Sequence, residues 1–170
     1  MITADHAVLM AQYNRWQNRS LYTAADQLSE AQRREDKGAF FGSIHNTLAH
    51  VLWGDRAWMS RFAGTAPVRP EDRQGLGPAY QDWQALQRDR AEFDAVILDW
   101  SSTLSPDWLA GDFTWTNSAG TRTSTQKAWI LVTHLFNHAT HHRGQAHALL
   151  TSFGAKPDDT DIQFMPELNS

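Results

Sequence analysis

The feature that most constrains the fold is a set of four long segments in which apolar residues recur every three or four positions. This spacing is typical of amphipathic helices. The segments cover residues 3–28, 43–62, 78–100 and a last stretch from 124 or 125 to 153. Helices of this length can bury their apolar faces against one another, so we expect an all-α protein built as a four-helix bundle.

The stretch between the third and fourth segments follows a different pattern. Phe113 and Trp115 alternate with threonines, and residues 117–120 (Asn-Ser-Ala-Gly) have the composition of a turn. We therefore expect a small hairpin or an irregular excursion over residues 105–122. Residues 158–170 are expected to form an extended tail on the bundle. No internal repeat or low-complexity run divides the chain, which predicts a single domain over residues 1–170.

Charge and composition exclude several classes of protein. The net charge is −4 with histidine counted neutral, and positive and negative side chains are mixed along the chain. No basic stripe is present, so nucleic acid is not an expected partner. The absence of cysteine excludes disulfides, thiolate metal sites and a cysteine nucleophile. With no export signal and no apolar run of about 18 residues, we expect a cytoplasmic protein without membrane contacts.

The fourth helical segment carries a group of histidines on its apolar face. His138 and His142 are four residues apart, so they lie on the same side of a helix. Their stripe continues to Gln145, which makes the middle of an otherwise apolar face polar. Burying two imidazoles is costly unless each finds a partner, and a divalent cation is an efficient partner for both. The spacing alone is also compatible with hydrogen-bonded or surface histidines, and the glutamate of the His-Glu-x-x-His protease motif is absent.

The second segment offers a third ligand in two places. His45 and His50 flank its apolar stripe on opposite sides, and periodicity does not choose between them. Asp55 lies at the centre of that stripe, where an apolar residue is expected. A buried carboxylate needs a cation, a histidine N–H or an arginine. Asp55 is therefore interpreted as a group that supports a metal site, as a partner for Arg143, or as half of a structural ion pair.

Three stretches of the sequence resemble the DinB/YfiT-like family of metal-dependent four-helix-bundle proteins. They are residues 13–21 (YNRWQNRSL), 43–58 (SIHNTLAHVLWGDRAW) and 137–145 (NHATHHRGQ), in the order found in the family. The resemblance implies an up-down-down-up bundle that is often a homodimer. It also implies a divalent metal held by one histidine of the second helix and by a His-x-x-x-His pair of the fourth. In this sequence those positions are His50, His138 and His142.

The same resemblance suggests a function. Three neutral histidines leave a metal with an open position, as in catalytic sites. Several relatives are thiol S-transferases or thiol-dependent isomerases, so we expect a metal-dependent enzyme that acts on a small-molecule substrate with a low-molecular-weight thiol cofactor. Zinc or nickel is the expected metal, since both suit histidine nitrogen. Asp55, Arg143 and Gln145 are the candidates for orienting the ligands or the substrate.

Two other functions remain open on the sequence. The first is a non-enzymatic metal-binding or stress-response protein, in which the metal is structural or sensory. The second is metal-assisted hydrolysis, for which Asp55, His134 or His141 would have to serve as general base. A serine hydrolase is disfavoured because no Gly-x-Ser-x-Gly motif is present.

Overall fold

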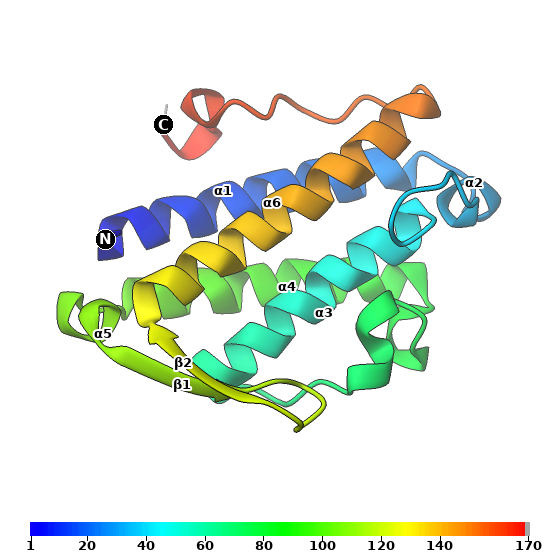
Figure 1. The fold of residues 1–170 in the computed structure, drawn as a ribbon. Coiled ribbons are helices and arrows are strands. Elements are labelled where there is room, and N and C mark those ends of the chain that lie inside the picture. The colour runs from blue at the N-terminus through cyan, green and yellow to red at the C-terminus, as the bar shows by residue number, and fades with distance from the viewer. Residues whose placement is uncertain (169–170) are drawn as a thin grey trace.

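A computed structural model describes residues 1–168 and consists mainly of four long helices. They are α1 (Ala4–Asp26), α3 (Ile44–Phe62), α4 (Trp83–Ser102) and α6 (Ala128–Ser152). In Figure 1, α1 and α6 run in one direction and α3 and α4 run in the other. α1 contacts α4 and α6, and α3 contacts the same two helices. The mostly helical character that the apolar spacing predicted is confirmed.

Side-chain caps set where these helices begin. The Thr3 and Ser43 hydroxyls accept hydrogen bonds from the backbone N–H groups of His6 and Asn46, at the first turns of α1 and α3. α4 begins at Trp83 rather than at residue 78, because the Asp82 carboxylate accepts from the N–H of Ala85 at 2.6 Å and caps the helix there. The predicted start at residue 78 was wrong, since a separate 3₁₀ turn, η2 (Pro78–Tyr80), lies there.

The predicted hairpin is present and delays the start of α6. Strand β1 (Asp112–Thr116) pairs antiparallel with β2 (Thr123–Lys127), with Asp112 opposite Lys127. Because residues 123–127 belong to β2, α6 begins at residue 128 and not at 124 or 125. Phe113 and Trp115 are partly buried, whereas the threonines between them are exposed and bond across the strands. The alternation of aromatic residues with threonines therefore marks the two faces of a strand.

Shorter elements connect and close the helices. They are α2 (Glu30–Arg34), η1 (Pro70–Gln74), α5 (Pro106–Ala110), η3 (Ile162–Phe164) and η4 (Pro166–Leu168). The C-terminal tail runs beside α1 (Figure 1), where the Tyr13 hydroxyl donates to the Thr160 carbonyl at 2.7 Å. The expected tail thus packs on the helices as far as residue 168, and residues 169–170 lie outside the described part. Within residues 1–168, no helix has the length and apolar character needed to cross a bilayer.

The core consists of two apolar clusters separated by a polar level. One cluster includes Leu21, Leu48 and Leu86, and the other includes Met59 and Ile97. Between them along the long helices stand buried polar side chains, which are Asn14, Asn18, Asp55, Arg90, Asp94, His142 and Arg143. Buried polar groups must find hydrogen-bond partners. These side chains therefore favour the one arrangement of the helices in which their partners face one another.

Candidate metal centre

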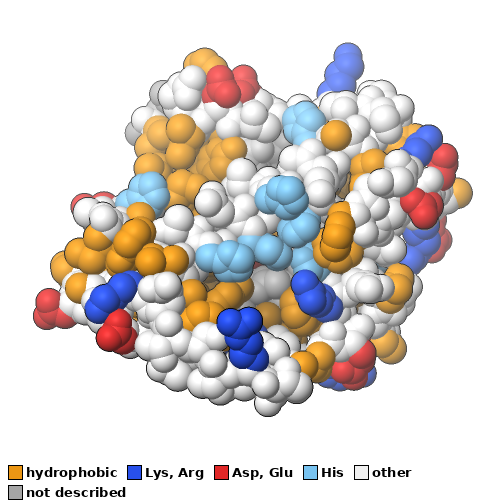
Figure 2. Space-filling model, in the orientation of Figure 1, with side chains coloured by type: hydrophobic (Ala, Val, Ile, Leu, Met, Phe, Trp, Pro, Cys, Tyr) orange, Lys and Arg blue, Asp and Glu red, His pale blue; other side chains and the backbone are white. Residues whose placement is uncertain are grey.

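Three histidines from two neighbouring helices lie close together. His50 belongs to α3, and His138 and His142 belong to α6. One ring nitrogen of each lies within 4.8 Å of the others, and the Nε2 atoms of His50 and His138 are 3.1 Å apart. Figure 2 shows histidine side chains gathered across the middle of one face of the molecule. The residues that the family resemblance selected are therefore brought together.

Hydrogen bonds on the far side of two rings fix where their protons lie. The Nδ1 atom of His50 is 2.5 Å from the carbonyl oxygen of Arg73, and Nδ1 of His142 is 2.8 Å from Oε1 of Gln145. A carbonyl oxygen only accepts, so both Nδ1 atoms carry the proton. The Nε2 atoms are then left with a free lone pair, which is the arrangement that metal-binding histidines adopt.

The histidine group could hold a divalent metal ion. Two ligand nitrogens on a tetrahedral zinc ion lie about 3.3 Å apart, close to the 3.1 Å between His50 and His138. Burial lowers the pKa of His50 to about 4 and that of His138 to about 3. Burial also lowers the pKa of His142. All three rings are therefore neutral at pH 7, the form that binds a metal.

Phe41 and Gly54 shape the site, and sequence reasoning missed both. The Phe41 ring stacks on His50 with ring centroids 3.9 Å apart and meets the edge of His142 at 5.2 Å. A Cβ atom at position 54 would lie 2.7 Å from Cε1 of His138, so only glycine leaves room for that ring. A glycine inside an amphipathic helical segment was the available sequence signal, because it is unfavourable there without a packing reason.

A cavity of about 430 Å³ opens beside the cluster. His50, His138 and His134 form part of its wall. Aromatic side chains and two arginines contribute other parts of the wall, which are Trp53, Trp58, Trp115, Arg61 and Arg73. The site therefore combines three neutral imidazoles with an adjoining space large enough for a small molecule.

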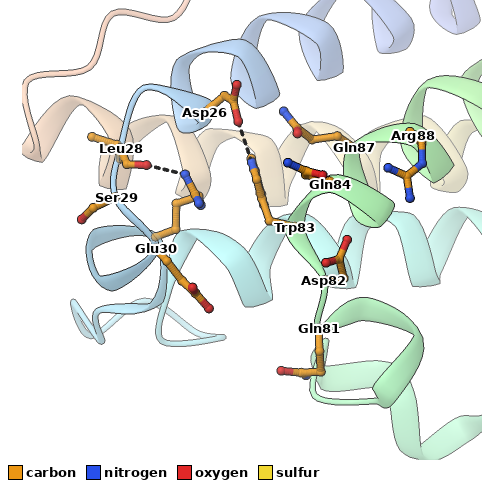
Figure 3. Close-up of a pocket in the computed structure, with 11 residues that line it drawn as sticks. Asp26, Leu28, Ser29, Glu30, Gln81, Asp82, Trp83, Gln84, Gln87 and Arg88 are labelled. Carbon is orange, nitrogen blue, oxygen red and sulfur yellow. Dashed lines mark hydrogen bonds between the residues drawn. The ribbon is translucent and has the colours of Figure 1, made fainter.

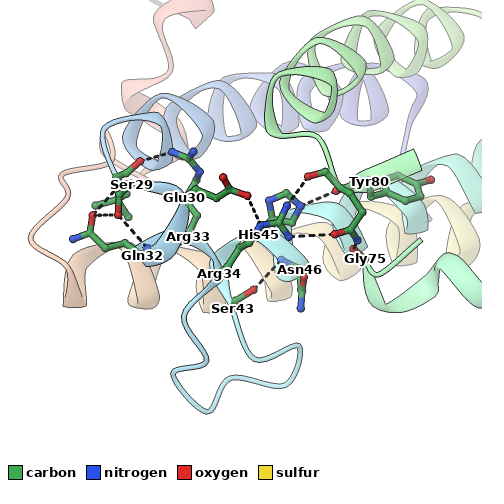
Figure 4. Close-up of polar contacts among 12 residues, drawn as sticks. Ser29, Glu30, Gln32, Arg33, Arg34, Ser43, His45, Asn46, Gly75 and Tyr80 are labelled. Carbon is green, nitrogen blue, oxygen red and sulfur yellow. Dashed lines mark hydrogen bonds and ion pairs between the residues drawn. The ribbon is translucent and has the colours of Figure 1, made fainter. Parts of the chain in front are cut away.

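Two other histidines have separate surroundings. His45 is buried, and its Nε2 atom is 2.7 Å from the Tyr80 carbonyl oxygen, as Figure 4 shows. It is absent from the cluster that residues 1–168 form, so of the two candidates on α3 it is His50 that joins the pair on α6. His141 is exposed, and its Nε2 atom is 3.3 Å from the amide nitrogen of Gln145.

The candidates for orienting groups divide into two kinds. Gln145 touches the cluster through its hydrogen bond with His142. Asp55 instead pairs with Arg90, with Oδ2 and Nη1 2.7 Å apart and both side chains almost fully buried. Arg143 donates to Asn14 and to the Thr140 hydroxyl. Of the three interpretations of Asp55, the observed contact is thus the structural ion pair, and its partner is Arg90 rather than Arg143.

A larger cavity, of about 790 Å³, lies away from the histidines between α2 and the start of α4. Figure 3 shows a hydrogen bond between two of its lining side chains, Trp83 and Asp26. Nε1 of Trp83 donates to the Asp26 carboxylate at 2.9 Å. Arg33 on its wall donates to the Leu28 carbonyl at the end of α1. These contacts join α1, α2 and α4, so we interpret the surface as structural.

The fold and the site define a class of mostly helical proteins with a three-histidine group that could hold a metal ion. Comparison with known families gives the more specific result. The family model described as DinB family matches residues 1–169, and the chain therefore belongs to the DinB family. It is also similar to Protein DinB of Bacillus subtilis (strain 168), with 25% identity over 164 residues that cover 93% of this chain and 92% of that protein. The resemblance found in the three sequence stretches is confirmed.

Proposed function

We propose that His50, His138 and His142 bind one divalent metal ion through their Nε2 atoms. The observation that carries this proposal is that one ring nitrogen from each histidine converges on the same place. In addition, the Nδ1–H groups of His50 and His142 donate to the carbonyl oxygens of Arg73 and Gln145. Such outer hydrogen bonds orient the rings and increase their basicity as ligands. We propose zinc or nickel as the ion, bound in an up-down-down-up four-helix bundle that assembles as a homodimer.

We further propose that the protein is a metal-dependent enzyme that acts with a low-molecular-weight thiol, as an S-transferase or isomerase. A metal with three protein ligands keeps a position open, where it can hold a thiol as thiolate or activate water. The cavity beside His50 and His138 supports this proposal, because a second reactant has room next to that position. The choice of a thiol rests on the family resemblance. Asp55 and Arg143 then act by keeping the helices in place.

The alternative is a non-enzymatic protein whose metal stabilises the fold or senses a ligand. It is favoured by the burial of His50 and His142, because a bound cation would provide a partner for buried imidazole nitrogens. The two functions differ in their response to thiols. An enzyme of the proposed type binds a thiol at the metal and consumes it with an electrophile, whereas a structural site gains stability from metal and does not bind thiols.

Elemental analysis of protein purified without an affinity tag tests the metal site. We expect about one metal ion per chain in the native protein and almost none in the double variant His138→Ala, His142→Ala. His6→Ala is the matched control, because this exposed histidine at the start of α1 is remote from the cluster in sequence and is absent from it. No metal in the native protein, or equal metal in the native protein and the double variant, would contradict the proposal.

A further inference from the structure

Two arginines line the cavity beside the histidines without a carboxylate partner. Arg61 comes from the last turn of α3 and Arg73 from η1. No ion pair involves either side chain among residues 1–168, whereas the nearby Arg69 pairs with Asp72 at 2.9 Å. The described part of the cavity wall includes no aspartate or glutamate. This space therefore has a net positive wall in a protein whose overall charge is −4.

Arg61 is held in position before any ligand arrives. Its Nε donates to the Thr116 carbonyl at 3.2 Å, and its Nη2 donates to the Ser118 hydroxyl at 2.9 Å. The guanidinium carbon also lies 4.9 Å from the centre of the Trp58 ring. A side chain that is already ordered loses little conformational entropy when it binds an anion. Residues of the hairpin thus hold the Arg61 guanidinium in place at the cavity wall.

Arg73 acts on the same space from the side of the histidines. Its backbone carbonyl accepts from Nδ1 of His50, which places η1 against the cluster. Its side chain lines the same cavity wall as His50 and His138. Its side chain is exposed, so it can reach a ligand without breaking an internal contact.

Three tryptophans form another part of the cavity wall. Trp58 and Trp115 face the cavity with ring centroids 5.7 Å apart, and Trp53 lies beside His50 at 5.9 Å. Indole rings bury large apolar areas and stack on flat groups. Guanidinium groups match carboxylates through paired N–H donors. The wall thus offers one surface for an apolar body and another for an anionic group.

We propose that this cavity selects small organic anions, with Arg61 and Arg73 binding a carboxylate and Trp58 and Trp115 contacting an apolar body. That the other end of the ligand lies at the metal rests on the proposed function. The preference for an anion is independent of the proposed function. The expected substrate of the site is a carboxylate-bearing small molecule, including a thiol that carries a carboxylate.

The first test uses tryptophan fluorescence of the metal-free chain. We expect 1-naphthoate to bind at least about ten-fold more tightly than neutral 1-naphthalenemethanol, the effect of one charge-assisted contact. In the double variant Arg61→Met, Arg73→Met the two affinities should come within about two-fold of each other.

Arg122→Met, which removes an exposed hairpin arginine outside the cavity wall, is the control and should keep the preference for naphthoate. The single variant Arg73→Met keeps the hydrogen bonds between Arg61 and the hairpin, so misfolding of the hairpin cannot explain its result. This variant should lose part of the preference for naphthoate.

The second test links the anion to the metal. Cobalt-loaded protein is titrated with thioglycolate, 2-mercaptoethanol and cysteamine, and the thiolate-to-cobalt absorption band is followed. We expect the affinity to be highest for thioglycolate, the anion, lower for neutral 2-mercaptoethanol and lowest for cysteamine, the cation. In the arginine variants these differences in affinity should be smaller, while the cobalt content should be the same as in the native protein. Equal affinities in the native protein, or a preference that survives both arginine substitutions, would overturn the inference. A naphthoate preference in a chain that binds no metal would uphold the inference while refuting the proposed function.

Discussion

At the scale of single residues, the site depends on the space left by one glycine. Gly54 lies on α3 directly opposite His138, and the imidazole occupies the volume where a Cβ would stand. Glycine inside a helix costs about 1 kcal/mol relative to alanine. The chain accepts this cost at a position of α3 where the His138 ring comes close to the helix backbone.

We expect Gly54→Ala to weaken zinc binding about 10- to 100-fold, the range found when groups that orient metal ligands are changed. The added Cβ, 2.7 Å from Cε1 of His138, forces the ring or the helix to move. Competition titration with a chromogenic chelator measures the affinity. Gly144→Ala is the control, because no heavy atom lies within 4 Å of its Cβ position, and it should leave zinc affinity unchanged. Native affinity in Gly54→Ala would contradict the assigned role.

At the scale of elements, one buried arginine connects three helices. Arg90 on α4 pairs with Asp55 on α3 at 2.7 Å and with Asp94 on its own helix at 2.8 Å. Asn18 on α1 donates to Asp94 at 2.9 Å. Burial raises the pKa of both carboxyl groups, and the neighbouring guanidinium acts in the opposite direction. Charges in the core thus hold α3, which carries His50, against α4, and α4 against α1.

We expect Arg90→Met to lower the free energy of unfolding by about 3–5 kcal/mol, because it leaves two buried carboxylates without their cation. Urea denaturation measures the change. Arg56→Met is a matched control, since Arg56 also joins α3 to α4 by pairing with Asp89 at 2.8 Å but lies nearer the solvent. Its loss should cost no more than about 1 kcal/mol. Equal effects of the two substitutions would show that burial is not what makes Arg90 important.

At the scale of the whole molecule, stability depends on pH through the buried histidines. In the unfolded chain each histidine titrates near its ordinary pKa of 6.5, whereas burial lowers the pKa of His50 to about 4 and that of His138 to about 3. Below pH 6.5 the unfolded state therefore takes up protons that the folded state does not. Stability is fully present above this pH and decreases as the pH falls toward 4.

We expect the metal-free protein to lose about 4 kcal/mol of unfolding free energy between pH 7.5 and 5, with about 2 kcal/mol from each of these two histidines. The measurement is urea denaturation at both pH values for the native chain and for His50→Gln, His138→Gln. Comparison of the two proteins cancels the contribution of Asp55 and Asp94, which is common to both. The variant should show a clearly smaller loss. The same pH dependence in both proteins would mean that other groups are responsible.

Local patterns predicted the parts of the fold that depend on neighbours along the chain. Helical spacing located the four long helices, and the alternation around Phe113 and Trp115 located the hairpin. Helix starts were less certain, because the Asp82 cap and the pairing of β2 compete with helical spacing at positions 78–82 and 123–127. The placement of His138 and His142 on one face also follows from spacing alone.

The sequence by itself therefore determined the helices, the hairpin, the shared face of His138 and His142, and, through its resemblance to a family, the choice of His50. The tertiary structure alone decided that Arg90 is the partner of Asp55, that Gly54 makes room for His138, and that Arg61 and Arg73 meet at one cavity. The physical reason is the range of the interactions. Periodicity describes which face of a helix a residue occupies, whereas contacts between helices depend on how those helices pack and rotate against one another.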